Sequence, residues 1–254
     1  MSFDPLVRIT KTDTMRLMLL HVSRGYFYWT SGEVEASRAL PFAAKMADQY
    51  GADIDRNRRA RAREAGQANA VLFMYPARNS TKLKWWLLAT EGEGEVRRRE
   101  KMLDTRFTGQ RLTWSPGYEV APMTKQGRQR PAWSWRIKPE EMRDWCARLR
   151  QAARSTDPTA MQQAIWSMFR VPGFASARSQ VGHLLAYAKR EWKIAGNVSD
   201  FPPCPPKLFY IRHRVAEAQP LSALVRRAAR GGVGWFGNTA RNIQLDNQQP
   251  RLTR

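Results

Sequence analysis

The sequence has few of the residues that a metal centre or a disulfide framework requires. Its 254 residues include two cysteines and three histidines. Cys146 and Cys204 are not spaced as a redox pair and cannot form a zinc site alone, so we expect free thiols in a reducing compartment. No compact acidic motif offers ligands for a pair of metal ions. We therefore predict no metal and no cofactor.

Long apolar runs are absent as well. The longest, LMLL at 17–20 and WWLLA at 85–89, are far too short to cross a bilayer. The first residues, MSFDPLVRITKTDT, lack the apolar core of a signal peptide. The chain also has no Walker-type loop and no HExxH, GxSxG or EF-hand motif. The short apolar runs and the N-terminal residues predict a cytoplasmic protein that does not use a membrane, and the missing motifs exclude several familiar catalytic and metal sites.

Positive charge is what the chain has in excess. Lysine and arginine number 43 against 22 acidic residues, which gives a formal net charge of +21, spread along most of the sequence. A field of this sign attracts polyanions, nucleic acid first and an anionic membrane second. Arginine outnumbers lysine, and its planar, forked side chain suits phosphates and base edges. With 43% hydrophobic residues, the composition also predicts a folded core.

The local patterns predict an α+β fold. Strands are expected at 16–32 (two around a turn at 23–25, or one that runs into a loop), 70–92 (a hairpin), 111–139 and 208–215. Helices are expected from Leu40 to Gly51, at 92–107, three times within 139–196, and at 221–230. The basic run at 53–69 is either a solvated helix or a loop that orders on a partner.

Three parts follow from this pattern. Residues 1–138 are the β-rich N-terminal part of the α+β core, and 139–196 are a basic helical block. Residues 197–254 hold a proline linker, SDFPPCPPK, then a returning strand and a glycine-rich loop. Because a strand returns after the helices, we expect the block to be inserted into a sheet that uses both chain ends.

Cleavage of RNA needs no metal, because the 2′-hydroxyl can attack the adjacent phosphate once a base removes its proton. Histidine is the natural base, and cations must stabilise the charged phosphorane. His21 is the candidate base, although a structural histidine in a strand is the alternative interpretation. Arg24, beside Gly25 at the expected turn, is the first candidate cation, and Arg38 is a less specific choice.

Residues 230–237 read RGGVGWFG, and they form a candidate phosphate-binding loop. Glycine allows a partner backbone to approach closely at Gly231, Gly232, Gly234 and Gly237, and Arg230 precedes them. Trp235 either anchors this glycine loop to the core or stacks on a base. The loop, the basic α+β composition and the early His/Arg/Tyr segment resemble the CRISPR repeat-processing endoribonucleases, whose loop follows the pattern GxGxxxxxGxG. This chain has a shortened version.

The resemblance implies a core of two ferredoxin-like, RNA-recognition-motif-like βαββαβ halves with the basic helical block inserted. It also implies metal-independent cleavage of a CRISPR repeat stem-loop, with the glycine loop against that RNA. The arginine content and the helical insertion are most similar to the type IV branch. Members of that branch process CRISPR RNA and stay bound in an effector ribonucleoprotein with other subunits. Their active site relies on arginines, which implies roles for Arg24, Arg38 and Arg241.

Further basic residues are candidates for RNA binding, although a charge run is often just a solvated face. They are Arg56, Arg58, Arg59 and Arg61 of the basic run, and Arg143, Arg150, Arg178 and Lys189 of the helical block. A basic helix face suits the phosphates of an RNA stem, and it suits duplex DNA equally. The leading hypothesis is therefore a CRISPR-repeat endoribonuclease. The alternative is a non-catalytic nucleic-acid-binding accessory protein of a plasmid or other mobile element, which binds without turnover.

Overall fold

The computed structural model describes residues 3–77, 79–124, 132–155, 157–205, 208–211, 217–231 and 234–237. Its class is α+β, as expected. The chain divides into two compact units: the first comprises residues 1–112 and 214–254, and the second residues 113–213. The boundary expected between 138 and 139 falls inside the second unit. Among the described helices, none is long and apolar enough to cross a membrane.

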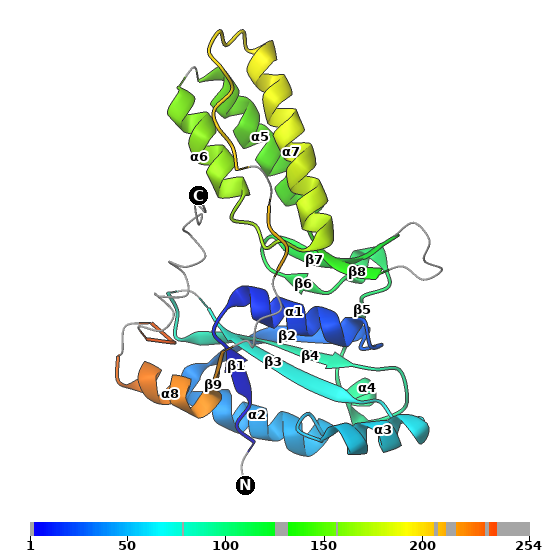
Figure 1. The fold of residues 1–254 in the computed structure, drawn as a ribbon. Coiled ribbons are helices and arrows are strands. Elements are labelled where there is room, and N and C mark those ends of the chain that lie inside the picture. Colours follow the sequence, from blue (N-terminus) through cyan, green and yellow to red (C-terminus); the bar gives the residue numbers. More distant parts are fainter. Residues whose placement is uncertain are drawn as a thin grey trace, which may run out of the picture. The chain divides into compact units, whose positions relative to one another are not determined.

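A four-stranded antiparallel sheet forms the centre of the first unit (Figure 1). Its strands are β2 (Tyr28–Glu35), β3 (Ala70–Pro76), β4 (Lys82–Ala89) and β5 (Leu103–Asp104). They lie in the order β3-β4-β2-β5, and every neighbouring pair is antiparallel. The hairpin expected at 70–92 is thus confirmed as β3 and β4.

The two strands expected at 16–32 are wrong in their first half, because α1 (Lys11–Val22) is a helix. The Thr10 side chain accepts a hydrogen bond from the Asp13 N–H at 3.1 Å and caps its N-terminus. Met15, Met18 and Val22 recur at helical spacing and are fully buried. The leucines and methionines that suggested a strand are also strong helix formers, so the tertiary packing decides between the two.

The helix expected from Leu40 begins earlier, because α2 runs over Ala36–Tyr50 with Pro41 inside it. Proline removes one backbone bond there, but the buried alanines of the same helix outweigh that loss. The helix ends as expected at Gly51, which adopts the left-handed conformation with φ 62°. α2 and α8 (Leu221–Ala229) cover one face of the sheet, and α1 covers the other (Figure 1).

Smaller elements complete the first unit. The basic run forms α3 (Arg56–Glu64), and the charged stretch expected to be helical over 92–107 contains only α4 (Glu95–Arg99) before β5. β1 (Leu6–Arg8) pairs antiparallel with β9 (Ala218–Pro220). Both ends of the chain therefore build this unit.

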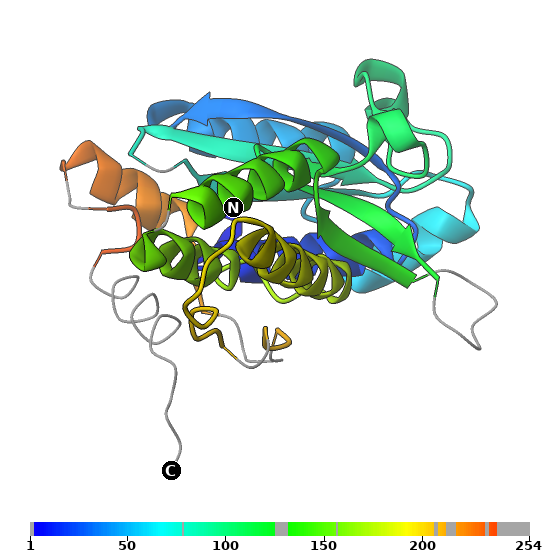
Figure 2. The same ribbon diagram turned by 90° about the horizontal axis from the view of Figure 1, so that it is seen from above.

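The second unit combines a three-stranded antiparallel sheet with three helices that lie side by side (Figures 1 and 2). The strands are β6 (Thr113–Trp114), β7 (Tyr118–Met123) and β8 (Ala132–Ile137). The helices are α5 (Pro139–Arg154), α6 (Pro158–Met168) and α7 (Ala175–Ile194), as expected for 139–196. Buried Leu149, Met161, Ile165, Val181 and Leu184 form the core between these helices.

The strand expected at 208–215 is absent from 208–211, and 212–216 lie outside the described residues. The segment instead passes close against the turn between α6 and α7. A Cβ on Gly173 would lie 1.8 Å from the Phe209 carbonyl oxygen, so only glycine permits this approach. The Gln162 side chain also donates to the Pro203 carbonyl at 2.8 Å. The linker is thus bound to its own unit, and the next strand among the described residues is β9.

Candidate nucleic-acid interface

His21 lies in the last turn of α1, not in a strand. Its Nδ1 is 2.9 Å from the Leu17 carbonyl oxygen. A carbonyl can only accept, so Nδ1 carries the proton and the Nε2 of the neutral ring keeps its lone pair. The ring packs edge-on against Tyr26 and Phe73, with centroids 5.1 and 5.3 Å away. Among the described residues, none hydrogen bonds to Nε2.

The surroundings of His21 favour its neutral form. Burial lowers the pKa of His21 below its ordinary 6.5, and the positive charges of Arg59 and Arg24 lower it further, while the Leu17 bond opposes them. At neutral pH the ring is therefore unprotonated and able to accept a proton at Nε2. Both features fit a general base.

Arg24 lies in the turn that ends α1. Its N–H donates to the His21 carbonyl at 2.9 Å, and Gly25 follows with φ 95°. The Arg24 side chain is exposed, and its own carbonyl accepts a hydrogen bond from the Arg63 guanidinium at 3.2 Å. The sequence singled out Arg24, and it gave Arg63 only as part of the basic run, with no sign that the two lie together.

α3 brings a dense group of arginines to this place. Five of its nine residues are arginine, and none of its side chains is buried. Asp55 caps the helix. Three polar bonds hold α3 to the unit: Arg59 to the Ala52 carbonyl, Arg63 to the Arg24 carbonyl, and the Asn69 amide to the Arg59 carbonyl. The run expected as a solvated helix or an ordering loop is a solvated helix.

The cations near His21 are not neutralised. In the part of the chain that the structure describes, none of Arg24, Arg59 and Arg63 forms an ion pair with a carboxylate. The Arg59 Nε is buried without a hydrogen-bond partner among the described residues. The same is true of the Oδ1 of Asn69, whose amide nitrogen donates to the Arg59 carbonyl. Arg56 and Arg61 are exposed, and Arg58 lies 3.9 Å from Asp55. We call His21, Arg24, Arg59 and Arg63 the His21 cluster.

Arg38 does not join the His21 cluster. It lies exposed in the first turns of α2, just after β2 ends, whereas Arg24 lies just before β2 begins. The eight residues of β2 separate the two by roughly 25 Å at about 3.4 Å per residue. Arg241 and Gly232 lie outside the described residues.

Trp235 of the glycine loop contacts the turn between β3 and β4, at the far end of β3 from α3. The Trp235 indole N–H donates to the Ser80 carbonyl at 3.1 Å, and Phe236 is buried in the core. Trp235 packs beside that core, which favours the anchor interpretation over base stacking. Gly231, Gly234 and Gly237 have φ of 64°, 74° and 64°, and Arg230 ends α8.

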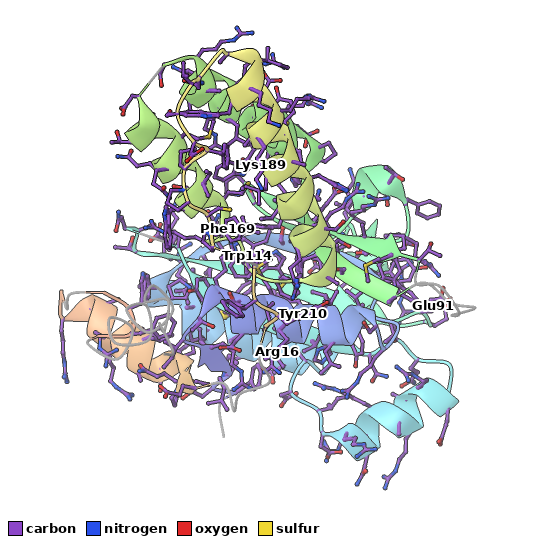
Figure 3. The ribbon with its side chains drawn as sticks, turned by 45° about the horizontal axis from the view of Figure 1, so that its top comes forward. Arg16, Glu91, Trp114, Phe169, Lys189 and Tyr210 are labelled. Carbon is purple, nitrogen blue, oxygen red and sulfur yellow. The ribbon has the colours of Figure 1, made fainter. Side chains whose placement is uncertain are left out.

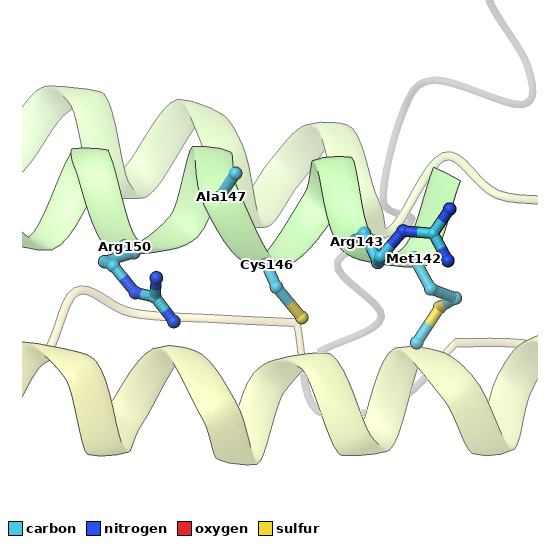
Figure 4. A pocket seen from close by; sticks show the side chains of 5 residues that line it. All are labelled: Met142, Arg143, Cys146, Ala147 and Arg150. Atoms are coloured by element: carbon cyan, nitrogen blue, oxygen red, sulfur yellow. The ribbon is translucent and has the colours of Figure 1, made fainter. Parts of the chain in front are cut away.

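The candidate residues of the helical block lie in the second unit. On α5, Arg143 lies 3.9 Å from Glu140 and Arg150 lies 3.5 Å from Glu191. Both guanidinium groups remain at least half exposed, so these pairs contribute little to stability. A shallow hollow runs along this face, lined by Met142, Arg143, Cys146, Ala147 and Arg150 (Figure 4).

The two candidates on α7 contact aromatic rings of the proline linker and of the segment that follows it. The Arg178 guanidinium lies 3.3 Å from the ring centre of Tyr210, and the Lys189 ammonium lies 5.8 Å from that of Phe201. Figure 3 labels Lys189 and Tyr210. Cation–π contacts of this kind help to bind the linker to α7. These charges therefore have a structural use within the unit.

Among the described residues, no group of three or more His, Cys, Asp or Glu side chains could hold a metal ion. Comparisons of the chain with protein-family models, curated proteins and solved structures give no match. The functional interpretation therefore depends on the geometry of the residues described above.

Proposed function

We propose that this chain binds RNA and cleaves it without a metal ion, with His21 as the base. The observation that carries the proposal is the state of the His21 ring: Nδ1–H is bound to Leu17, and Nε2 is left open beside unpaired arginines. A neutral imidazole with its lone pair available is what removal of a 2′-hydroxyl proton requires.

The reaction would proceed by attack within the RNA strand. Nε2 accepts the proton of the 2′-hydroxyl, the 2′ oxygen bonds to the adjacent phosphorus, and the bond to the 5′ oxygen breaks. The imidazolium then returns its proton to the departing 5′ oxygen, directly or through a water. The products are a 2′,3′-cyclic phosphate and a 5′-hydroxyl. Arg24 and Arg59 would stabilise the negative charge of the phosphorane.

The exposed arginines of α3 support binding of the same RNA. Arg56, Arg58 and Arg61 lie on the helix whose other arginines reach the His21 cluster. Phosphates bound by these side chains would place the strand beside Nε2. The glycine loop, at the other end of β3, would then contact a separate part of the RNA.

We further infer a ferredoxin-like topology for the four-stranded sheet. Its elements follow the order β2–α2–β3–β4–α4–β5, with α3 added. β2 and β3 are both antiparallel to β4, which lies between them, so they are parallel to each other as in a split βαβ unit. The second βαββαβ half that the resemblance implies is not among the described elements; the second unit has the sheet and helices given above.

The substrate we propose is a CRISPR repeat stem-loop, following the resemblance of the glycine loop and the basic composition. Retention of the product in an effector ribonucleoprotein belongs to the same proposal. The alternative function, a non-catalytic nucleic-acid-binding accessory protein, is favoured by one observation. The arginines of α3 would bind any polyanion, whether or not His21 acts on it.

The test is cleavage of stem-loop RNAs, with and without CRISPR repeat sequence, in EDTA. His21→Asn keeps an N–H for the Leu17 carbonyl but has no base at the Nε2 position. We expect it to slow cleavage by roughly 10²–10⁴-fold, the usual contribution of a general base. His183→Asn, on the exposed face of α7, is the matched control and should leave the rate unchanged.

A 2′,3′-cyclic phosphate product, with cleavage blocked by a 2′-deoxy substitution, supports the mechanism. Equal cleavage of repeat and unrelated stem-loops would remove the CRISPR assignment but leave the chemistry intact. Unchanged cleavage by His21→Asn would overturn the assignment of the base. Tight, salt-dependent binding with no cleavage of any RNA would establish the accessory protein instead.

A further inference from the structure

The turn that follows β5 is fixed by an unusual number of polar contacts. The buried Asp104 donates its backbone N–H to the Gln110 side chain at 2.9 Å, and its carboxylate accepts three hydrogen bonds from the Arg106 side chain at 2.7–3.1 Å. The Trp29 indole N–H donates to the Gln110 carbonyl at 2.8 Å. The backbone between residues 104 and 110 is therefore held in one conformation.

This rigid turn presents an aromatic ring to solvent. Phe107 is 61% exposed, although it lies between buried Asp104 and buried Leu112. Nearby residues pair guanidinium groups with rings: Arg106 lies 4.9 Å from the ring centre of Phe27, and Arg97 lies 3.3 Å from that of Tyr28. A single exposed ring is ordinary on a protein surface. Phe107 differs in directly following Arg106, whose planar cation is held by Asp104 and is a second surface on which a base can stack.

The acidic groups near the turn are already engaged. Asp104 and Glu91 both bind Arg106, at 2.7 and 2.5 Å. Glu91 is labelled in Figure 3. The Tyr28 hydroxyl also accepts a hydrogen bond from Arg106 at 2.9 Å. The guanidinium is thus fixed in place, and an anionic strand approaching Phe107 meets carboxylates that are already paired.

We propose that Phe107 is a stacking site for an unpaired base of the RNA strand from which His21 removes the 2′-hydroxyl proton. This inference rests on the proposed function and identifies its substrate as RNA with an unpaired nucleotide a few positions away from the cut. Aromatic rings and arginine planes are the surfaces on which unpaired bases stack. His21 packs on Phe73 of β3 and Phe107 follows β5, so the two lie toward opposite edges of the sheet, and the RNA would pass from one to the other across the start of β2, where Tyr26 contacts His21 and Phe27 lies beneath Arg106.

The experiment uses a series of RNAs, each with 2-aminopurine at one unpaired nucleotide near the cut and with a 2′-deoxy sugar at the cut that prevents cleavage. Stacking quenches 2-aminopurine fluorescence, so the wild-type chain should quench one labelled position on binding. Phe107→Ala should abolish that quenching and weaken binding by about 5- to 100-fold, the cost of losing one stacked base. Phe107→Trp should preserve both the quenching and the binding affinity.

Phe209→Ala is the matched control, because that ring is also 61% exposed but lies in the second unit. It should leave both signals unchanged. A fully paired duplex is the second control, since a stacking site requires an unpaired base. Equal loss of binding to duplex and single-stranded RNA by Phe107→Ala would overturn the inference, as would unchanged quenching.

Failure of this inference and failure of the proposed function give different results. If Phe107→Ala changes nothing while His21→Asn abolishes cleavage, the stacking site is wrong and the nuclease stands. If no RNA is cleaved, yet Phe107→Ala removes the quenching, the chain is a single-strand binder and the stacking site stands.

Discussion

Gln180 joins α7 to the edge of the sheet in the second unit, and its replacement tests how that unit is held together. Its side-chain amide donates to the Ile137 carbonyl at 2.9 Å and accepts from the Ile137 N–H at 2.8 Å. β8 lies at the edge of the order β6-β7-β8, so Gln180 satisfies two backbone groups that would otherwise lack a partner there. We predict that Gln180→Leu destabilises this unit.

The magnitude follows from the two groups left unpaired. Each buried backbone group without a partner costs about 1–3 kcal/mol. Gln180 is half-buried, so water can enter and reduce that penalty. The expected loss in the free energy of unfolding is therefore about 2–4 kcal/mol for the pair. Leucine fills a similar volume, which keeps cavity formation out of the measurement.

The assay combines urea unfolding with amide hydrogen exchange. Exchange assigns the effect to one unit, because peptides covering β8 should lose protection while those covering β3 and β4 keep theirs. Gln163→Leu, at an exposed position of α6, is the control. A difference between the two variants below about 1 kcal/mol, less than one unsatisfied group should cost, would refute the reasoning.

Two further predictions concern the first unit. Because the pKa of His21 is lowered below 6.5, the unfolded state binds its proton more readily, so stability should fall as the pH drops below about 6.5. Urea unfolding between pH 7.5 and 5.5 should show a smaller decrease for His21→Asn than for the wild type, and equal decreases would contradict the assigned environment. Gly92 has φ 120°, and an added Cβ would lie 2.7 Å from backbone atoms, so Gly92→Ala should cost about 2–4 kcal/mol. Gly66→Ala, with φ 70° and open space, should cost only about 1 kcal/mol in the same unfolding assay, and equal losses would show that the contact is unimportant.

Local patterns predicted the elements whose signals lie within a few residues. The β3–β4 hairpin and the helices after Pro139 and Pro158 carry turn and start signals that need no distant partner. The strand expected at residue 16 is wrong because an apolar run fits a helix or a strand equally well. Thr10 and Asp13, three residues apart, form the capping signal that would have decided it.

The candidate site was predictable only in its parts. His21 and Arg24 are close in the sequence, and their chemistry suggested them as a pair. The place of Arg59 beside these two residues is seen only in the structure. α3 is held by hydrogen bonds to Ala52 and Asn69, and such bonds leave no periodic pattern in the sequence. Phe107 gave no signal either, since an exposed ring differs from a buried one only after the turn has folded.

If the chain binds RNA as proposed, the coverage of its central sheet limits where that RNA can lie. In RNA-recognition motifs, bases stack on aromatic residues of an open sheet face. Here α2 and α8 pack on one face, and α1 packs on the other, where Phe73 contacts His21. Bases cannot stack on either face without displacing a helix. The end of the sheet where α1 stops and α3 begins carries the His21 cluster. The turn after β5, which contains Phe107, follows the strand that pairs with the start of β2. The sheet would therefore act as a scaffold that positions loop residues, with the RNA bound at its end.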